Sequence, residues 1–386
     1  MDFELSAEQH AFIGTAREFA QEELAPYAGQ WDAESTFPRE AIAKAGELGF
    51  CGLYTPENAG GLALPRLDSA LVFEQMAAVD PSTTAFISIH NMATWMLGTW
   101  ASESVRDHWG PPLASGEKLA SYCLTEPGSG SDAASIKTRA ERDGDSWVIS
   151  GSKAFISGAG ATDLLVLMAR SGGPGAAGIS AFAVPADTPG ISYGKKEHKM
   201  GWNSQPTRAI SFDGARIPAE NLLGNEGDGF KIAMKGLDGG RINIATCSVG
   251  AAQGALDHAL RYTGERQQFG RPLASFQALQ FKLADMATDL VAARQMVRLA
   301  ASKLDAGAPD ASTFCAMAKR FATDAGFDVV NQGLQLHGGY GYLHEYPLER
   351  LLRDARVHQI LEGTNEIMRI IIARRLLQQG TADFLT

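Results

Sequence analysis

The change in hydrophobic periodicity along the chain is the feature that most restricts its fold. Residues 1–119 carry apolar residues at helical spacing, beginning after the capping-box sequence Ser6-Ala-Glu-Gln9. Residues 120–228 change to short β-rich runs, and residues 229–386 return to long amphipathic helical patterns. Because strands and helices do not alternate, this order excludes a doubly wound parallel sheet. We predict an α+β protein with an N-terminal helical domain, a central β-barrel-like domain and a C-terminal four-helix bundle.

The same patterns predict the individual elements. In the N-terminal part we expect a helix from near Pro38 to Gly49, and further helices over 66–79, 83–98 and 102–109, with start signals at Pro81 and Ser102. In the central part we expect strands over 146–150, 163–168, 179–184 and 208–212. In the C-terminal part we expect long helices over 230–263, 276–304, 311–336 and 363–378.

Charge, hydropathy and cysteine spacing exclude several classes of protein. The formal net charge of −10, without any basic run, disfavours binding to nucleic acid. No apolar stretch approaches the roughly 20 residues that a membrane helix needs, and the acidic residues among the first positions are atypical of a signal or transit peptide. We therefore expect a cytoplasmic protein that does not bind membranes. The four cysteines are widely spaced, so we expect neither a disulfide framework nor a metal site.

Two motifs in the β-rich part have the composition of a ligand-binding site. Residues 122–132, YCLTEPGSGSD, run from a strand-like start into a loop rich in Gly, Ser and free backbone N–H groups, which can bind a phosphate or the polar edge of a ring. Residues 153–158, KAFISG, place Phe155 two positions before Ser157, so both side chains should lie on one face of a strand. Taken separately, the first motif is equally compatible with a simple turn, and the second with ordinary sheet alternation.

Two further motifs lie in the C-terminal part. Residues 335–341, QLHGGYG, contain glycines like those of a dinucleotide fingerprint, but no strand precedes them, so a Rossmann site lacks its structural context. Helix C-capping by Gly338 is the favoured explanation of this run when it is taken by itself. Glu362 lies in an apolar context just before Gly363 and a helix whose expected N-cap is Thr364. Most such glutamates do no more than stabilise the positive end of a helix.

Together these motifs resemble the acyl-CoA dehydrogenase family over essentially the whole chain. The resemblance is carried by YCLTEPGSGSD (122–132), FISG (155–158), GGR (239–241), ERQQFG (265–270), QLHGGYGY (335–342) and EGTNEI (362–367). Four segments further resemble the isobutyryl-CoA subgroup of that family: 88–91, 201–208, 238–245 and 356–362. The resemblance implies FAD-dependent oxidation of a short branched acyl-CoA, isobutyryl-CoA to methacrylyl-CoA as in valine degradation. A 2-methylbutyryl or other short-chain acyl-CoA is the alternative substrate.

The resemblance also implies roles for individual residues. Glu362 would be the base that removes the α-proton of the thioester, and an apolar setting should raise the pKa of its carboxyl. Its backbone N–H and the flavin ribityl 2′-hydroxyl would be the donors to the enolate oxygen. FAD would contact Tyr122, Leu124, Thr125, Ser131, Phe155, Ser157, Arg266, Gln268, Phe269, Gln335, Gly338, Gly339, Thr364 and Glu366. CoA would contact Ser131, Asp238, Arg241, Gly363 and Arg374, and Arg241 can at the same time pair with Asp238.

The same resemblance implies two protein partners. Arg266, Gln268, Phe269 and the segment 335–339 would reach the FAD of a neighbouring subunit, which requires at least a dimer and favours a homotetramer. An electron-transfer flavoprotein would accept the electrons. An oxidase or monooxygenase of the same fold is one competing hypothesis, and a non-catalytic helical scaffold is another.

Three positions depart from other branches of the family. Relatives that act on isovaleryl or long-chain thioesters carry the base at the position of Gly240; glycine cannot serve, which leaves Glu362 alone. Glutaryl-type relatives carry an arginine near Thr84, and no cation stands there in this sequence, which disfavours a dicarboxylic substrate. Phe155 occupies a position where many relatives carry tryptophan, so the surface available for stacking is slightly smaller.

Overall fold

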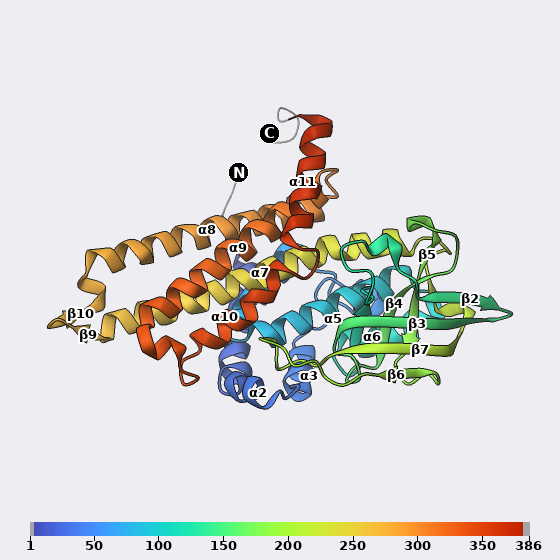
Figure 1. Cartoon of the computed structure of the whole chain (residues 1–386), viewed down its shortest axis with the longest axis horizontal. Helices are drawn as coiled ribbons and strands as arrows, with labels where there is room; N and C mark the ends of the chain where they lie inside the picture. The colour runs from blue at the N-terminus through green and yellow to red at the C-terminus, as the bar shows by residue number, and fades with distance from the viewer. Residues whose placement is uncertain (1–3, 381–386) are drawn as a thin grey trace.

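The computed structural model describes residues 4–380, and its N-terminal part is built from helices (Figure 1). The predicted capping box is present, because Ser6 Oγ accepts from the Gln9 N–H and the Gln9 side chain accepts from the Ser6 N–H. Asp80 caps the helix that begins at Pro81, and Ser102 caps the next one. The helices are α1 (Ala7–Phe19), α2 (Ala28–Glu34), α3 (Arg39–Glu47), α4 (Arg66–Ala77), α5 (Pro81–Trp100) and α6 (Glu103–Ala114).

The central part forms one mostly antiparallel sheet with strand order β6-β7-β3-β2-β4-β5-β8, while β1 pairs in parallel with β4. Its two halves meet through a single residue pair between β2 and β4, and apolar residues of β3 and β7 pack against those of β4 and β5. The sheet therefore folds over one core, as a barrel-like domain does. The strands are β1 (Ala120–Cys123), β2 (Arg139–Asp143), β3 (Ser146–Ser157), β4 (Leu164–Arg170), β5 (Ile179–Pro185), β6 (Ile191–Tyr193), β7 (Thr207–Pro218) and β8 (Leu222–Leu223).

Long helices return in the C-terminal part, together with the small hairpin of β9 (Gln267–Gln268) and β10 (Arg271–Pro272). The core of the bundle is shared by α7, α8 and α9 and by α4 from the N-terminal part. The final helix α11 packs against α9 and projects away from the bundle axis, so α4 takes the inner position that the sequence pattern suggested for α11 (Figure 1). The helices are α7 (Gly229–Glu265), α8 (Gln277–Asp305), α9 (Ala311–His337), α10 (Leu348–Arg356) and α11 (Asn365–Gln379).

The sheet and the bundle are joined through α5 and α7. Met92 and Met96 of α5 and Ile232 of α7 pack in one cluster with Val166 of β4 and Ile179 of β5. Leu124, at the start of the 122–132 loop, packs in the same cluster as Ile232 of α7. The long α7 then runs to the far end of the molecule (Figure 1). Within residues 4–380, none of the helices has the combination of length and apolar character that a membrane span requires.

Candidate active site

Glu362 lies in the segment that connects α10 to α11, and its side chain is only partly exposed. Its backbone has a φ of 56°, in the left-handed region that residues other than glycine seldom occupy. Its Oε2 atom is buried and has no hydrogen-bond partner among the described residues. A Cβ at position 240 of α7 would overlap this Oε2, so the carboxylate occupies space that only a glycine leaves open.

The electrostatic setting of Glu362 suits a base. Burial raises the pKa of the Glu362 carboxyl to about 7, and the nearby cations Arg241 and Lys319 offset this only in part. Lys319 of α9 also holds the segment in place, because its Nζ donates to Gly363 O at 2.8 Å and to Asn365 Oδ1 at 2.9 Å. Sequence reasoning missed Lys319, since a lysine on an amphipathic helix gives no sign that it faces inward.

The start of α11 has the predicted cap. Thr364 Oγ1 accepts from the Ile367 N–H at 3.3 Å, which fixes the direction of the chain directly after Glu362. The side chain of Glu366 is exposed and pairs with Arg369 at 3.5 Å. Arg374 is exposed farther along the same helix. The contacts predicted for these residues with FAD or CoA stay predictions.

The 122–132 loop and the end of β3 lie side by side. The Ala154 N–H donates to Thr125 O at 2.9 Å, and Ser121 Oγ donates to Ser157 O at 2.7 Å. The hydroxyl of Tyr122 is buried without a hydrogen-bond partner among the described residues. Two motifs that are separate in the sequence therefore form one surface, which faces the Glu362 region through Tyr122.

The strand around Phe155 differs from the expected regular alternation. Its register against β7 shifts between Lys153 and Ile156, and Phe155 itself has a φ of 58°. This bulge inserts an extra residue into β3 and re-aims the ring, which is 70% exposed. The prediction of a regular strand through Phe155 and Ser157 was therefore wrong in its geometry, although the backbone of this part of β3 bonds to the chain at Ser121 and Thr125.

A fully buried ion pair holds this loop on the sheet. Lys153 Nζ lies 2.8 Å from Glu126 Oε1 and donates to Leu124 O at 2.9 Å. Glu126 also accepts from the backbone N–H groups of Lys137 at 2.6 Å and Thr138 at 2.9 Å. Although burial by itself raises the pKa of the Glu126 carboxyl, Lys153 and these hydrogen bonds lower it overall, so the carboxylate is charged. Both residues stand in the quoted motifs, but their pairing was not predicted.

The residues predicted to bind CoA lie partly together. Asp238 and Arg241 of α7 form an ion pair at 2.6 Å, and Asp238 Oδ1 also accepts from Ser312 Oγ at 2.8 Å. Arg241 is close enough to Glu362 to influence its pKa. Ser131 lies in the exposed part of the 122–132 loop.

A second set of predicted contacts lies far from Glu362, at the end of the molecule that carries β9 and β10 (Figure 1). Gly240 and Arg266 are separated by roughly 26 residues of α7, or about 39 Å along its axis. Arg266 stacks over the Tyr340 ring at 5.6 Å, and the neighbouring Phe269 is 93% exposed. A cavity of about 670 Å³ here is lined by Tyr262, Arg266, Gln268, Leu273, Leu279, Lys282, Gln335, Leu336, His337, Gly338, Gly339, Tyr340 and Leu343.

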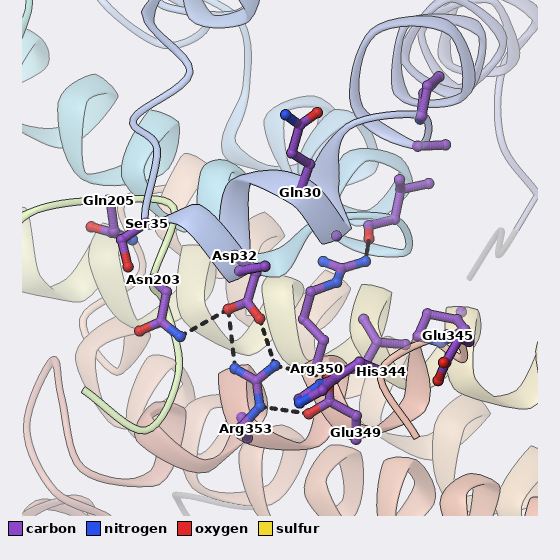
Figure 2. A pocket seen from close by; sticks show the side chains of 18 of the residues that line it. Gln30, Asp32, Ser35, Asn203, Gln205, His344, Glu345, Glu349, Arg350 and Arg353 are labelled. Carbon is purple, nitrogen blue, oxygen red and sulfur yellow. Dashed lines mark hydrogen bonds and ion pairs between the residues drawn. The ribbon is translucent and has the colours of Figure 1, made fainter. Parts of the chain in front are cut away.

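A larger cavity, of about 1040 Å³, is lined by parts of α2, the 196–206 segment, α7 and α10 (Figure 2). Arg353 crosses one side of it, donating to Asp32 Oδ1 at 3.0 Å and to Glu349 Oε2 at 2.6 Å. Asn203 donates to the same Asp32 oxygen at 3.0 Å. None of the residues predicted to touch substrate or cofactor lines this cavity.

Models of known protein families match nearly the whole chain. Three family models match it in succession: the N-terminal domain of acyl-CoA dehydrogenase over residues 6–117, the middle domain over 121–215 and the C-terminal domain over 227–377. This chain belongs to the acyl-CoA dehydrogenase family. The acyl-CoA dehydrogenases are flavoprotein oxidoreductases, and the fold and family predicted from the motifs are confirmed.

Two of the relatives most similar in sequence are isobutyryl-CoA dehydrogenases. The chain is 54% identical to the mitochondrial isobutyryl-CoA dehydrogenase of Bos taurus, covering 97% of this chain and 90% of that protein. It is 53% identical to the mitochondrial isobutyryl-CoA dehydrogenase of Dictyostelium discoideum, covering 96% and 90%. In structure it matches a chain solved in work on the electron transferring flavoprotein of Acidaminococcus fermentans, with a TM-score of 0.96, 42% identity and coverage of 98% and 100%. The predicted resemblance to the isobutyryl-CoA subgroup is confirmed.

Proposed function

We propose that this chain removes the α and β hydrogens of isobutyryl-CoA to give methacrylyl-CoA, with Glu362 as the base. The observation that carries the proposal is the Oε2 atom of the Glu362 carboxylate, which is buried, has no hydrogen-bond partner among the described residues, and lies opposite the bare Cα of Gly240. Similarity to two isobutyryl-CoA dehydrogenases supports the choice of substrate. Thr84, whose hydroxyl is buried and bonded to Asp80 O, offers no cation to a second carboxylate.

The residues of this chain would bind and orient the thioester. The unpartnered Glu362 Oε2 would take the α-proton, and the apolar surroundings that raise the pKa of this carboxyl match it to that task. The Glu362 backbone N–H would donate to the thioester oxygen. The ion pair of Asp238 and Arg241 lies on the same stretch of α7 as Gly240 and would orient CoA from there. Ser131, Gly363 and Arg374 are proposed as further CoA contacts.

FAD fits the surface formed by the 122–132 loop and β3. Tyr122 presents a buried hydroxyl without a partner in residues 4–380, and the bulge at Phe155 turns an aromatic ring outward, where it can stack on a flat ring system. Tyr122, Leu124, Thr125, Ser131, Phe155 and Ser157 would hold the cofactor there, with Thr364 and Glu366 from α11. When bound, FAD would supply the acceptor for the β-hydride.

We also propose a homo-oligomer, with a tetramer as the expected state. The cavity near Arg266 lies at the opposite end of α7 from Glu362, too far to reach a cofactor bound beside Tyr122 of the same subunit (Figure 1). Exposed Phe269 and the residues Gln268, Gln335, Gly338 and Gly339 would therefore meet the FAD of a neighbouring subunit. An electron-transfer flavoprotein is the proposed electron acceptor and the cytoplasm the proposed location.

Changing Arg266 to alanine should weaken FAD binding about 10- to 100-fold, as expected for loss of a charged hydrogen-bond donor. Because the contact is proposed to cross a subunit interface, the oligomer should also be weaker, and should dissociate at a higher protein concentration than the wild-type oligomer does. Arg271→Ala is a matched control, since that guanidinium lies in the hairpin that directly follows Arg266 but stacks on Phe276 at 4.1 Å. FAD titration and sedimentation would measure both effects. Unchanged FAD affinity in the Arg266 variant would contradict the proposed contact.

A panel of acyl-CoA substrates tests the proposed activity. We expect the highest kcat/KM for isobutyryl-CoA, with lower values for 2-methylbutyryl- and butyryl-CoA, because one methylene changes discrimination by only about 1–3 kcal/mol. Isovaleryl- and octanoyl-CoA should be poor substrates. If octanoyl-CoA were best, the proposed substrate would be wrong while the family would stand. Rapid oxygen consumption in the same assays would favour an oxidase, and absence of bound FAD a non-catalytic scaffold.

A further inference from the structure

The four segments that carry the resemblance to the isobutyryl-CoA subgroup, 88–91, 201–208, 238–245 and 356–362, meet in one small apolar cluster. Trp202 inserts its buried side chain between α5 and α7, and the chain directly before Glu362 packs on it through Leu361. The members of the cluster are Ala77, Ala85, Ile89, Trp202, Ile244, Cys247, Val357 and Leu361. The segment that carries the base therefore rests on residues from all three of the other segments.

A chain of hydrogen bonds through His358 crosses this cluster. The Trp202 indole N–H donates to His358 Nε2 at 3.3 Å, and His358 Nδ1 lies 2.8 Å from Ser248 Oγ. Because an indole nitrogen can only donate, Nε2 must accept, and the proton of the neutral ring is on Nδ1. That N–H donates to Ser248 Oγ, whose own hydroxyl donates to Ile244 O at 3.1 Å. The donor and the acceptor of each of these three hydrogen bonds are therefore defined.

The ring of His358 stays neutral. It is fully buried, and burial together with nearby Lys319 lowers the pKa of His358 to about 3. The direction of the hydrogen bonds is therefore constant over the pH range in which the enzyme is expected to work. Two other histidines are buried in residues 4–380, but they bond to backbone groups instead: His90 to Leu113 O and the Ala120 N–H, and His337 to Gly333 O.

The loop that carries Trp202 is anchored on its other side. The Trp202 N–H donates to Asp354 Oδ1 at 2.6 Å, and Asn203 donates to Asp32 on the wall of the large cavity (Figure 2). Trp202 has a φ of 55°, and a Cβ at Gly201 would overlap the backbone of Arg353, so the loop is pressed against α10 in a strained conformation. Such strain persists only where the surroundings determine the conformation, so the donor to His358 has a fixed position.

We propose that His358 is a positioning residue, which through Trp202 and Ser248 holds the 357–363 segment so that the Glu362 carboxylate stays opposite Gly240. This rests on the proposed function of Glu362 as the base. The bond to Ser248 matters most, because Ser248 and Gly240 lie on the same rigid helix, about 12 Å apart along its axis. His358 thereby ties the base to the helix that leaves space for it.

Two substitutions of His358 separate its two bonds. Asparagine places an amide N–H where Nδ1 lies and keeps the bond to Ser248, whereas glutamine places an oxygen where Nε2 lies and keeps only the bond to Trp202. We expect His358→Asn to retain most of the activity. His358→Gln should slow flavin bleaching by isobutyryl-CoA about 10- to 100-fold per bound FAD, the effect of a displacement of about 1 Å. Ser248→Ala should behave like His358→Gln.

The pH profile distinguishes positioning from a general structural role. The titratable groups around Glu362 are Arg241 of α7, Lys319 of α9, Tyr122 of β1 and Tyr54 before α4. Movement of the carboxylate out of this buried setting should lower the apparent pKa of the bleaching rate towards that of an ordinary carboxyl. A loss of packing alone would lower the melting temperature and leave the pKa of the remaining active sites unchanged.

Thr246→Val is the matched control for Ser248→Ala. Its hydroxyl is also buried on α7 and also donates to the carbonyl four residues earlier, Ile242 O at 2.8 Å, but it does not contact His358. The proposal fails if His358→Gln and Ser248→Ala bleach with the rate and pH profile of Thr246→Val. Bleaching by Glu362→Gln at the wild-type rate would overturn the assignment of the base itself, so the two failures are distinguishable.

Discussion

Glu362→Gln should retain FAD and the native fold but lose flavin bleaching by isobutyryl-CoA, by about 10²- to 10⁴-fold. The amide has the size of the carboxyl group and fits the space opposite Gly240, but it cannot accept the α-proton. Stopped-flow absorbance after mixing with substrate measures the rate directly. Bleaching at the wild-type rate would show that another group is the base.

The pH dependence gives this variant a second signature. In the wild type the bleaching rate should rise with pH through about 7, because the carboxyl is active only when ionised. The pKa of the Glu362 carboxyl is about 7 in the folded protein and 4.5 for an ordinary glutamate. The protonated carboxyl therefore contributes to the free energy of unfolding below about pH 4.5, and this contribution is lost as the pH rises through 7. Glutamine does not ionise, so the variant does not lose this stability as the pH rises. The variant should therefore gain more thermal stability over wild type at pH 8 than at pH 5.

The features that sequence patterns predicted are local ones. The caps at Ser6 and Thr364 depend on residues three positions apart, and the helical and strand patterns extend over single elements. Gly240 was noted as unable to act as a base, but its contact with the Glu362 carboxylate required the packing of α7. A residue type at one position can be read from the chain, whereas the space around it depends on several elements.

The features that were missed depend on long-range contacts or on backbone detail. His358 and Ser248 are 110 positions apart, so no local pattern reports their hydrogen bond. The bulge at Phe155 moves the buried positions of β3 from odd residues (Trp147, Ile149, Lys153) to even ones (Ala154, Ile156), and a lysine followed by an alanine gives no sequence signal of that change. The inner place of α4 in the bundle depends on which amphipathic helices meet, and several helices of this chain have suitable apolar faces.

The buried pair of Lys153 and Glu126 stabilises the site that would hold FAD. Its two residues are 27 positions apart and join the 122–132 loop to β3 in the fully buried interior. Desolvation makes such a pair a weak source of net stability, but removing one partner leaves the other as an uncompensated buried charge. We therefore expect a strong effect from substitution of the lysine alone.

Lys153→Met should destabilise the protein by about 3–5 kcal/mol and weaken FAD retention, because the Glu126 carboxylate loses its cation and Leu124 O its donor. Denaturation followed by tryptophan fluorescence, to which the buried Trp147 of β3 contributes, would measure the first effect, and flavin absorbance after gel filtration would measure the second. Lys137→Met is a suitable control, since that side chain is exposed near the same loop. The double variant Glu126→Gln/Lys153→Met should recover part of the stability, because it removes the unpaired charge and keeps an acceptor for one of the two N–H groups, of Lys137 or Thr138, that donate to separate oxygens of Glu126. If the single and double variants were equally unstable, shape rather than charge would control this site.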